Sequence, residues 1–177
     1  MQMNESAYFA TGCFWGAERR FWQLDGVTQT SVGYMGGTRP SPSYEQVCTG
    51  TTGHTETVKV EYDSAKISYH RLLEEFWTMH DPTSLNRQGG DIGTQYRSAI
   101  FTTTTEQMSE ALSTRDAYEK AISSSGYGAI VTEILTSDGV TYFPAEEYHQ
   151  KYLLKNPNGY DCHSSTGIAF PSEELTR

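Results

Sequence analysis

Hydrophobic and polar residues alternate along several short segments of this chain, which is the period of a β-strand with one buried face. The clearest case is residues 56–62, where Val58, Val60 and Tyr62 share one face and polar residues share the other. Compact hydrophobic runs between turn-forming residues predict further strands. These cover residues 6–11, 27–34, 97–103 and 131–136.

Other segments place apolar side chains every three or four positions, which is the spacing of one face of a helix. Residues 14–24 follow this rule, and so does a segment after Ser68, a residue type that commonly caps a helix. Further helices are predicted at 106–123 and 145–154. From residue 155 onwards the chain is expected to be mostly coil.

The predicted core elements follow one another in the order β-α-β-β-α-β, which indicates an α+β fold built as a two-layer sandwich with extra helices. The second and third strands are expected to pair antiparallel across a polar loop at 38–54. Neither an internal repeat nor a low-complexity linker interrupts the chain. Residues 1–177 are therefore expected to form a single domain, with 155–177 as a coil C-terminal tail.

Composition narrows the class of protein. Hydrophobic residues make up 36% and charged residues 20% of 177 positions, which is typical of a globular chain rather than a disordered one. No apolar run approaches the roughly 20 residues of a membrane span. The formal net charge of −9 argues against nucleic acid or an anionic membrane as a partner, because both usually require a basic patch.

The chain has three widely spaced cysteines, Cys13, Cys48 and Cys162. A disulfide scaffold would be denser, and a zinc site would show close pairs. The first residues lack a basic region followed by an apolar stretch, so no export signal is expected. We therefore expect the thiols in a reducing, cytoplasmic compartment, as inert core residues or as redox-active groups.

Cys13 lies where a strand gives way to a helix. Unpaired N–H groups and the partial positive charge of a helix N-terminus favour the thiolate, the nucleophilic form of cysteine. The alternative is a small buried residue at a turn. Phe14 falls on the apolar helix face, whereas Trp15 lies off it and is the better candidate for a pocket wall beside the sulfur.

Glu56 shares a strand face with Val58 and Val60. A buried carboxylate must pair with a cation or take up a proton, and a protonated glutamate is a general acid. Glu56 could instead lie exposed at a frayed strand end. The same loops carry Tyr44 and Tyr96, whose hydroxyls could donate to a polar oxygen or be ordinary surface groups.

Asp91 would by default be a turn residue. Among the histidines, His149 is expected to be a hydrogen-bonded core residue. His54, His80 and His163 show no metal-ligand spacing, so no metal is expected.

Several longer motifs, in one order and with compatible spacing, cover nearly the whole chain. They read Thr-Gly-Cys-Phe-Trp-Gly at 11–16, Val-Gly-Tyr-Met-Gly-Gly at 32–37, Tyr-Glu-Gln-Val-Cys-Thr-Gly at 44–50, Gly-His-Thr-Glu at 53–56, His-Asp-Pro-Thr at 80–83, Asn-Arg-Gln-Gly-Gly-Asp-Ile-Gly-Thr-Gln-Tyr-Arg-Ser at 86–98 and Glu-Tyr-His-Gln-Lys-Tyr-Leu at 147–153. With these motifs the chain resembles the peptide methionine-(S)-sulfoxide reductases of the A class.

The resemblance implies a ferredoxin-like fold and a reductase that repairs methionine sulfoxide, free or in proteins, without a bound cofactor. It implies that Cys13 attacks the sulfoxide sulfur and that Glu56 protonates the oxygen. The resemblance also implies roles for five residues that would contact the substrate. Tyr44 and Tyr96 would hydrogen-bond the oxygen, Phe14 and Trp15 would hold the S-methyl group, and Asp91 would orient the substrate or a water.

The resemblance also implies that a second thiol condenses with the sulfenic acid on Cys13, and that thioredoxin reduces the resulting disulfide. Family members often carry this thiol in a glycine-rich tail after a Gly-Tyr pair. Here Gly159-Tyr160 is followed by Asp161-Cys162-His163, so the pattern is displaced. We expect Cys162 to be the resolving cysteine, Cys48 to be a buried bystander, and the enzyme to act as a monomer.

The residues also allow two other classes of function. One is a different thiol enzyme, either a cysteine peroxidase or an acyl-transferring enzyme that uses His54 or His149 as its base. The other is a module without catalysis, in which the aromatic residues bind a peptide side chain.

Overall fold

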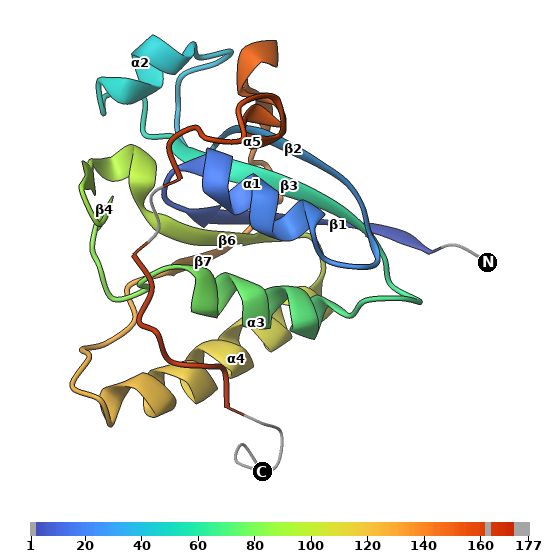
Figure 1. Ribbon diagram of the computed structural model, residues 1–177, viewed down its shortest axis with the longest axis vertical. Helices are drawn as coiled ribbons and strands as arrows, with labels where there is room; N and C mark the ends of the chain where they lie inside the picture. The colour runs from blue at the N-terminus through green and yellow to red at the C-terminus, as the bar shows by residue number, and fades with distance from the viewer. Residues whose placement is uncertain (1–2, 162–163, 172–177) are drawn as a thin grey trace.

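A six-stranded sheet in the order β7-β6-β1-β3-β2-β8 forms the centre of the computed structural model, which describes residues 3–161 and 164–171 (Figure 1). All neighbouring strands pair antiparallel except β6 and β7, which are parallel. The strands are β1 Asn4–Thr11, β2 Val27–Met35, β3 Thr55–Asp63, β6 Ser98–Thr102, β7 Glu133–Thr136 and β8 Phe143–Pro144.

Helices α1, α3 and α4 lie on one side of this sheet (Figure 1). The order β1-α1-β2-β3-α3-β6, with β6, β1, β3 and β2 as neighbours, confirms the predicted β-α-β-β-α-β core and the ferredoxin-like α+β fold. The helices are α1 Phe14–Trp22, α2 Tyr44–Cys48, α3 Tyr69–Met79, α4 Thr105–Ser123 and α5 Tyr152–Lys155. The 3₁₀ turns are η1 Thr94–Tyr96 and η2 Glu147–His149. A separate two-stranded sheet consists of β4 Arg87–Gln88 and β5 Asp91–Ile92.

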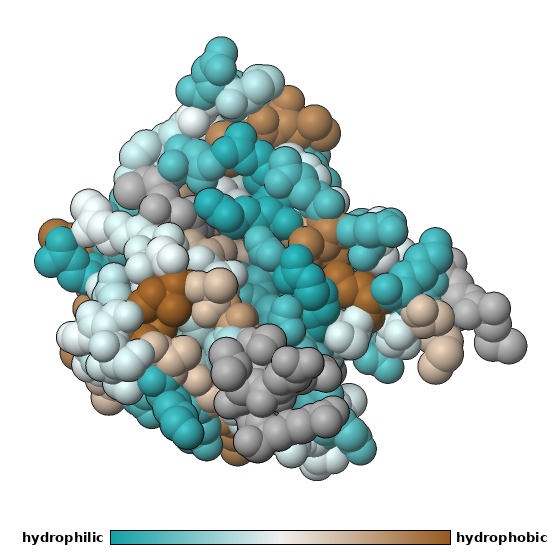
Figure 2. All heavy atoms as spheres, turned by 60° about the horizontal axis from the view of Figure 1, so that its bottom comes forward, coloured by the Kyte–Doolittle hydropathy of each residue, from teal (hydrophilic) through white to brown (hydrophobic). Residues whose placement is uncertain are grey.

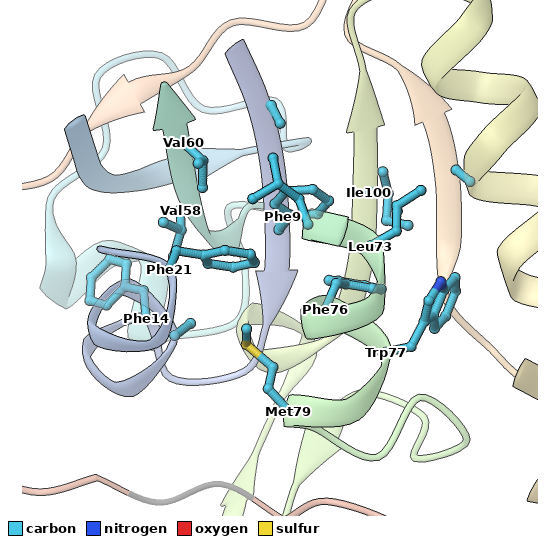
Figure 3. Packing of buried hydrophobic residues seen from close by; sticks show 14 of the residues in the cluster. Phe9, Phe14, Phe21, Val58, Val60, Leu73, Phe76, Trp77, Met79 and Ile100 are labelled. Atoms are coloured by element: carbon cyan, nitrogen blue, oxygen red, sulfur yellow. The ribbon is translucent and has the colours of Figure 1, made fainter. Parts of the chain in front are cut away.

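The hydrophobic core lies between the helices and the inward face of the sheet. Phe14 and Phe21 of α1 pack toward Val58 of β3, and side chains of α3 face Phe9 and Ile100 (Figure 3). Each large side chain of this kind contributes roughly 1.5–3 kcal/mol when it is fully buried. The apolar faces predicted for 56–62 and 14–24 therefore meet in this core between the helices and the sheet.

Local signals explain where several elements begin. Ser68 caps α3, as predicted, by accepting a 3.0 Å hydrogen bond from the Arg71 N–H, and Thr104 caps α4 in the same way. The predicted loop at 38–54 contains a helix, α2. A capping box starts this helix, in which the Ser43 and Gln46 side chains each bond the other residue's backbone.

The predicted helix at 145–154 is wrong, because this segment forms η2 and then α5, interrupted at Gln150 and Lys151. The Gln150 amide group bonds both the N–H and the C=O of Val32 on β2. Lys151 adopts a left-handed backbone with φ of 53°, and its N–H donates to the buried carboxylate of Glu18. Tertiary hydrogen bonds thus replace those of a continuous helix.

The face seen in Figure 2 is mostly hydrophilic, with a few separate hydrophobic spots. In the part of the chain that the structure describes, no helix is both long and apolar enough to cross a membrane.

Candidate active site

The site forms where β1 ends and β3 begins. These strands are antiparallel neighbours, so the C-terminal end of one lies beside the N-terminal end of the other. Cys13 follows β1 and forms the N-cap position of α1, and Glu56 is the second residue of β3. The pairing of two adjacent strands thus brings together a thiol and a carboxyl group that are distant in sequence.

Gly12 makes the turn between β1 and α1. Its φ of +106° is a conformation that side chains other than glycine rarely adopt. A Cβ atom at this position would approach Cγ of the buried Gln88 to 2.8 Å. Gln88 is itself held by hydrogen bonds to the N–H and C=O of Asp81, so the turn before Cys13 has little room to change.

The Cys13 thiol is buried, with 7% of the residue exposed. Burial raises its pKa above the ordinary value, and the nearby Glu56 carboxyl raises it further. The N–H groups of Trp15 and Gly16 act in the opposite direction, as expected at a helix N-terminus, although the side chain makes no capping hydrogen bond. Burial outweighs them, so the pKa of Cys13 lies above the ordinary value and not below it, as the helix N-terminus alone would favour.

Glu56 is buried, with 2% exposed, as strand parity suggested. Burial raises its pKa to about 8, the N–H of Phe14 lowers it, and the charge of Asp91 raises it. The Phe14 N–H donates a 3.1 Å hydrogen bond to Glu56 Oε1. At neutral pH the carboxyl group is therefore mostly protonated, with Oε2 as the place for the proton, and it can act as an acid.

Two tyrosines enter the site from different elements, α2 and η1. Ser43 and Gln46 fix α2, and the Tyr44 N–H donates to Glu146 Oε2 at 2.9 Å. Tyr96 is the last residue of η1. The hydroxyl of Thr55 on β3 donates to the carbonyls of Gln95 and Arg97, on either side of Tyr96, and so holds η1 against β3. Burial is the main cause that raises the pKa of both phenols, so both remain neutral donors at physiological pH.

Asp91 begins β5 and also lines the site. Its Oδ1 accepts a 3.0 Å hydrogen bond from the Tyr160 hydroxyl, and its buried Oδ2 has no hydrogen-bond partner among the described residues. A bound polar group would therefore find an acceptor here.

An aromatic wall closes the apolar side. The Trp15 ring stacks on Tyr152 with ring centres 3.8 Å apart, and its Nε1 donates to His149 Nδ1 at 3.0 Å. His149 is completely buried and also packs against Phe14 and Tyr44. Burial lowers the pKa of His149, so the ring stays neutral and supports the wall, as expected for a core histidine.

These groups enclose one cavity of about 150 Å³, which is enough for the end of a single side chain. The structure thus brings together the residues to which the resemblance assigns roles, except Cys162, which lies outside the described residues. The lining residues are Cys13, Phe14, Trp15, Tyr44, Glu56, Asp91, Tyr96 and Tyr160.

Sequence reasoning missed Tyr160 as a lining residue, although it belongs to the Gly-Tyr pair of the tail motif. It also missed Glu146, whose carboxylate accepts from both the Tyr34 hydroxyl and the Tyr44 N–H. Burial acts to raise the pKa of Glu146, but these hydrogen bonds outweigh it and hold the pKa below its usual value. No local sequence pattern marks Glu146, because its partners lie on β2 and α2.

The remaining candidates lie elsewhere. Cys48, expected to be buried, is an exposed free thiol at the end of α2 that does not line the cavity, because its short helix stands on the surface. His54 also stays outside it, since Nδ1 accepts from the Gly37 N–H and Nε2 contacts the Arg39 carbonyl. Within residues 3–161 and 164–171, no group of three or more acidic, histidine or cysteine side chains could hold a metal ion.

Comparisons with known proteins agree with this geometry. A family model described as peptide methionine sulfoxide reductase matches residues 5–173. The chain is 56% identical over 165 residues to peptide methionine sulfoxide reductase MsrA of Pseudomonas entomophila, covering 93% of this chain and 73% of that protein.

Two solved structures share the fold. Methionine sulfoxide reductase A of Corynebacterium diphtheriae matches with a TM-score of 0.86 and 43% identity, over 96% of this chain and 84% of that one. Mxr1 from Saccharomyces cerevisiae in its reduced form matches with a TM-score of 0.78 and 34% identity, over 96% and 93%.

Proposed function

This chain belongs to the peptide methionine sulfoxide reductase family, and we propose that it reduces the (S) epimer of methionine sulfoxide, free or in proteins, through Cys13. One observation carries the assignment of the residues. A buried thiol, a buried carboxyl group with a pKa raised to about 8 and two phenols line the same small cavity.

A sulfoxide sulfur is a poor electrophile until its oxygen is protonated or strongly hydrogen-bonded. In the proposed reaction Tyr44 and Tyr96 donate to the sulfoxide oxygen, and Glu56 supplies a proton as the S–O bond weakens. The Cys13 sulfur attacks the substrate sulfur and forms an S–S bond, while the thiol proton and the Glu56 proton leave with the sulfoxide oxygen as water. A water oxygen then attacks the Cys13 sulfur and breaks the S–S bond, so methionine leaves, Cys13 becomes a sulfenic acid and a proton returns to Glu56. The sulfoxide gains two electrons and the thiol loses two, so the step needs no further reactant.

The walls of the cavity fit the rest of the substrate. Phe14 and the rigidly held Trp15 present an apolar surface for the S-methyl group. Asp91 offers its free oxygen to orient a polar part of the substrate or a water.

The catalytic cycle closes through a second thiol. In this proposal Cys162 condenses with the sulfenic acid, releasing water and forming a Cys13–Cys162 disulfide, which thioredoxin reduces. Residues 1–177 act as a single catalytic domain and as a monomer, with no prosthetic group. A cytoplasmic location fits the free thiols of Cys13 and Cys48.

The decisive experiment mixes the reduced protein with methionine-(S)-sulfoxide and measures methionine released per chain. The wild type should release methionine without external reductant, and Cys13→Ala should release none. Cys48→Ser, which changes the exposed thiol outside the cavity, is the matched control and should behave as the wild type. If the wild type releases no methionine, the assignment is overturned.

The resolving role of Cys162 has a separate test. Cys162→Ser should release one methionine per chain and then stop turning over with thioredoxin. Continued turnover with thioredoxin would remove Cys162 from the cycle and leave the role of Cys13 intact.

A further inference from the structure

The chain after α5 returns past the active site and is attached there by two residues. Tyr160 lines the cavity and donates to Asp91, and Asp161 forms an ion pair with Arg19 on α1, the helix that Cys13 starts. These contacts fix the chain just before position 162.

A second attachment follows shortly after position 163. The hydroxyl of Tyr118 on α4 lies 2.6 Å from Thr166 Oγ1 and donates to the Ile168 carbonyl at 2.7 Å. Phe170 stacks on the Tyr118 ring with centres 5.9 Å apart, and its ring also meets the edge of His70 on α3. In Figure 1 this red segment runs across α3 and α4, away from the site.

The second attachment is specific because it satisfies a buried polar group. Tyr118 is completely buried, and both hydrogen-bond partners of its hydroxyl belong to the tail. Without the tail that hydroxyl would lose both partners inside the helical layer, which is costly. A tail that merely trailed over the surface would not need such a contact.

Together the two attachments restrict the chain between them. From Asp161 to Thr166, where the second attachment begins, there are five peptide units, each spanning about 3.8 Å between Cα atoms. A thiol in so short a tethered stretch reacts at a high effective concentration with a partner within its reach. Tyr160, two residues before Cys162, lines the same cavity as Cys13.

We propose that Tyr118 is a positioning residue for the resolving step, because it anchors the tail beyond Cys162 and so limits how far the second thiol can move from Cys13. The proposal rests on the proposed function, in which the Cys162 thiol and the Cys13 sulfenic acid form a disulfide and release water. Tyr118 touches neither sulfur and acts only through residues 166–170.

The experiment separates the two chemical steps in a single turnover with methionine-(S)-sulfoxide. Methionine release reports the attack by Cys13. Dimedone, added as a trap, competes with Cys162 for the sulfenic acid, and mass spectrometry gives the ratio of dimedone adduct to disulfide. Tyr118→Phe keeps the ring stacking and removes both hydrogen bonds to the tail.

Tyr62→Phe is the matched control. Tyr62 is also completely buried, and its hydroxyl donates to Glu5 at 2.9 Å, away from the tail. Thr166→Val is a second test variant, since it removes one of the same hydrogen bonds from the tail side without altering the core. It decides the question if Tyr118→Phe does not fold.

Tyr118→Phe should release methionine at the wild-type rate, while disulfide formation slows by about tenfold and the dimedone adduct rises accordingly. Thr166→Val should show a smaller change in the same direction, and Tyr62→Phe should show none. Disulfide formation as fast in Tyr118→Phe and Thr166→Val as in Tyr62→Phe overturns the anchoring role.

Failure of the proposed function would look different. If Cys162→Ser still formed an intramolecular disulfide, Cys162 would not be the resolving thiol, and the role of Tyr118 would fall with it. If Cys162→Ser accumulates only the sulfenic acid while the tail variants match the control, Cys162 keeps its role and Tyr118 alone loses its own.

Discussion

The backbone N–H of Phe14 donates a 3.1 Å hydrogen bond to Oε1 of Glu56. This bond joins the first residue of α1 to the buried carboxyl group of β3, directly beside Cys13. It uses one carboxyl oxygen as an acceptor and leaves the other to hold the proton. The orientation of the proposed acid is therefore set by the same helix N-terminus that carries the nucleophile.

Replacing Glu56 by Gln removes the transferable proton while keeping a group that can hydrogen-bond to Phe14. The rate of methionine release in a single turnover should fall by roughly 10²-fold or more, as expected for loss of a general acid. A decrease of only a few-fold would exclude the acid role. Glu45→Gln, which changes an exposed carboxylate on α2, serves as the control.

The pH dependence of the same rate provides an independent measurement. Glu56 must be protonated to act, and its pKa is about 8, so the rate should decline as the pH rises through about 8. Burial keeps the pKa of Cys13 raised, so its ionisation does not mask the decline. The decline should be absent in Glu56→Gln, and a wild-type rate that is flat between pH 7 and 9.5 would contradict the prediction.

Glu56 should also make the folded protein less stable as the pH rises. In the unfolded chain the carboxyl loses its proton near pH 4.5, whereas in the folded protein it keeps the proton up to about 8. Between these values unfolding releases a proton, so the free energy of unfolding decreases with pH, by up to about 1.4 kcal/mol per unit. Urea unfolding at pH 5.5 and 8 should show this loss in the wild type and a smaller one in Glu56→Gln.

The two phenols should contribute to the same step. Tyr44→Phe and Tyr96→Phe each remove one proposed donor to the sulfoxide oxygen, and each should slow methionine release by roughly tenfold, with a larger loss in the double variant. Tyr148→Phe is a suitable comparison, because Tyr148 is exposed and does not line the cavity. Equal rates in Tyr44→Phe, Tyr96→Phe and Tyr148→Phe would show that the phenols do not assist.

Gly12→Ala should destabilise the protein by about 1–2 kcal/mol and reduce activity. The alanine would have to adopt a positive φ, and its Cβ would meet Gln88. Gly128→Ala is the control, since no atom lies within 4 Å of the added Cβ and its φ is not positive. The midpoint of thermal unfolding should be lower for Gly12→Ala than for Gly128→Ala. Equal midpoints would show that the turn before Cys13 tolerates a side chain.

Much of this arrangement follows from local patterns. The alternation along β3 placed Glu56 on the buried face, and the helical spacing of α1 placed Phe14 in the core with Trp15 beside it. Such patterns succeed where burial of one face decides the conformation. They predicted the elements that carry Cys13 and Glu56, and with the motifs they indicated most of the residues around the cavity.

The failures share a different physical cause. The segment 145–154 has a helical pattern, yet Gln150 and Lys151 bond to β2 and to Glu18 instead of to their own helix. Glu18 is completely buried, and its partners Lys151 and Thr30 come from distant positions, so the stabilising contacts are invisible in a local window. Tyr160 and Glu146 were missed for the same reason.

The pairing of β1 with β3 has a consequence for how activity appears during folding. A shift of one residue between these strands would turn Glu56 to the opposite face of the sheet and away from Cys13. Tyr96 enters only when the chain as far as β6 is in place. A chain still being synthesised therefore lacks the complete reactive centre until the segment reaching β6 has left the ribosome, and methionine release at the full rate during refolding requires β1 and β3 to have paired in this register.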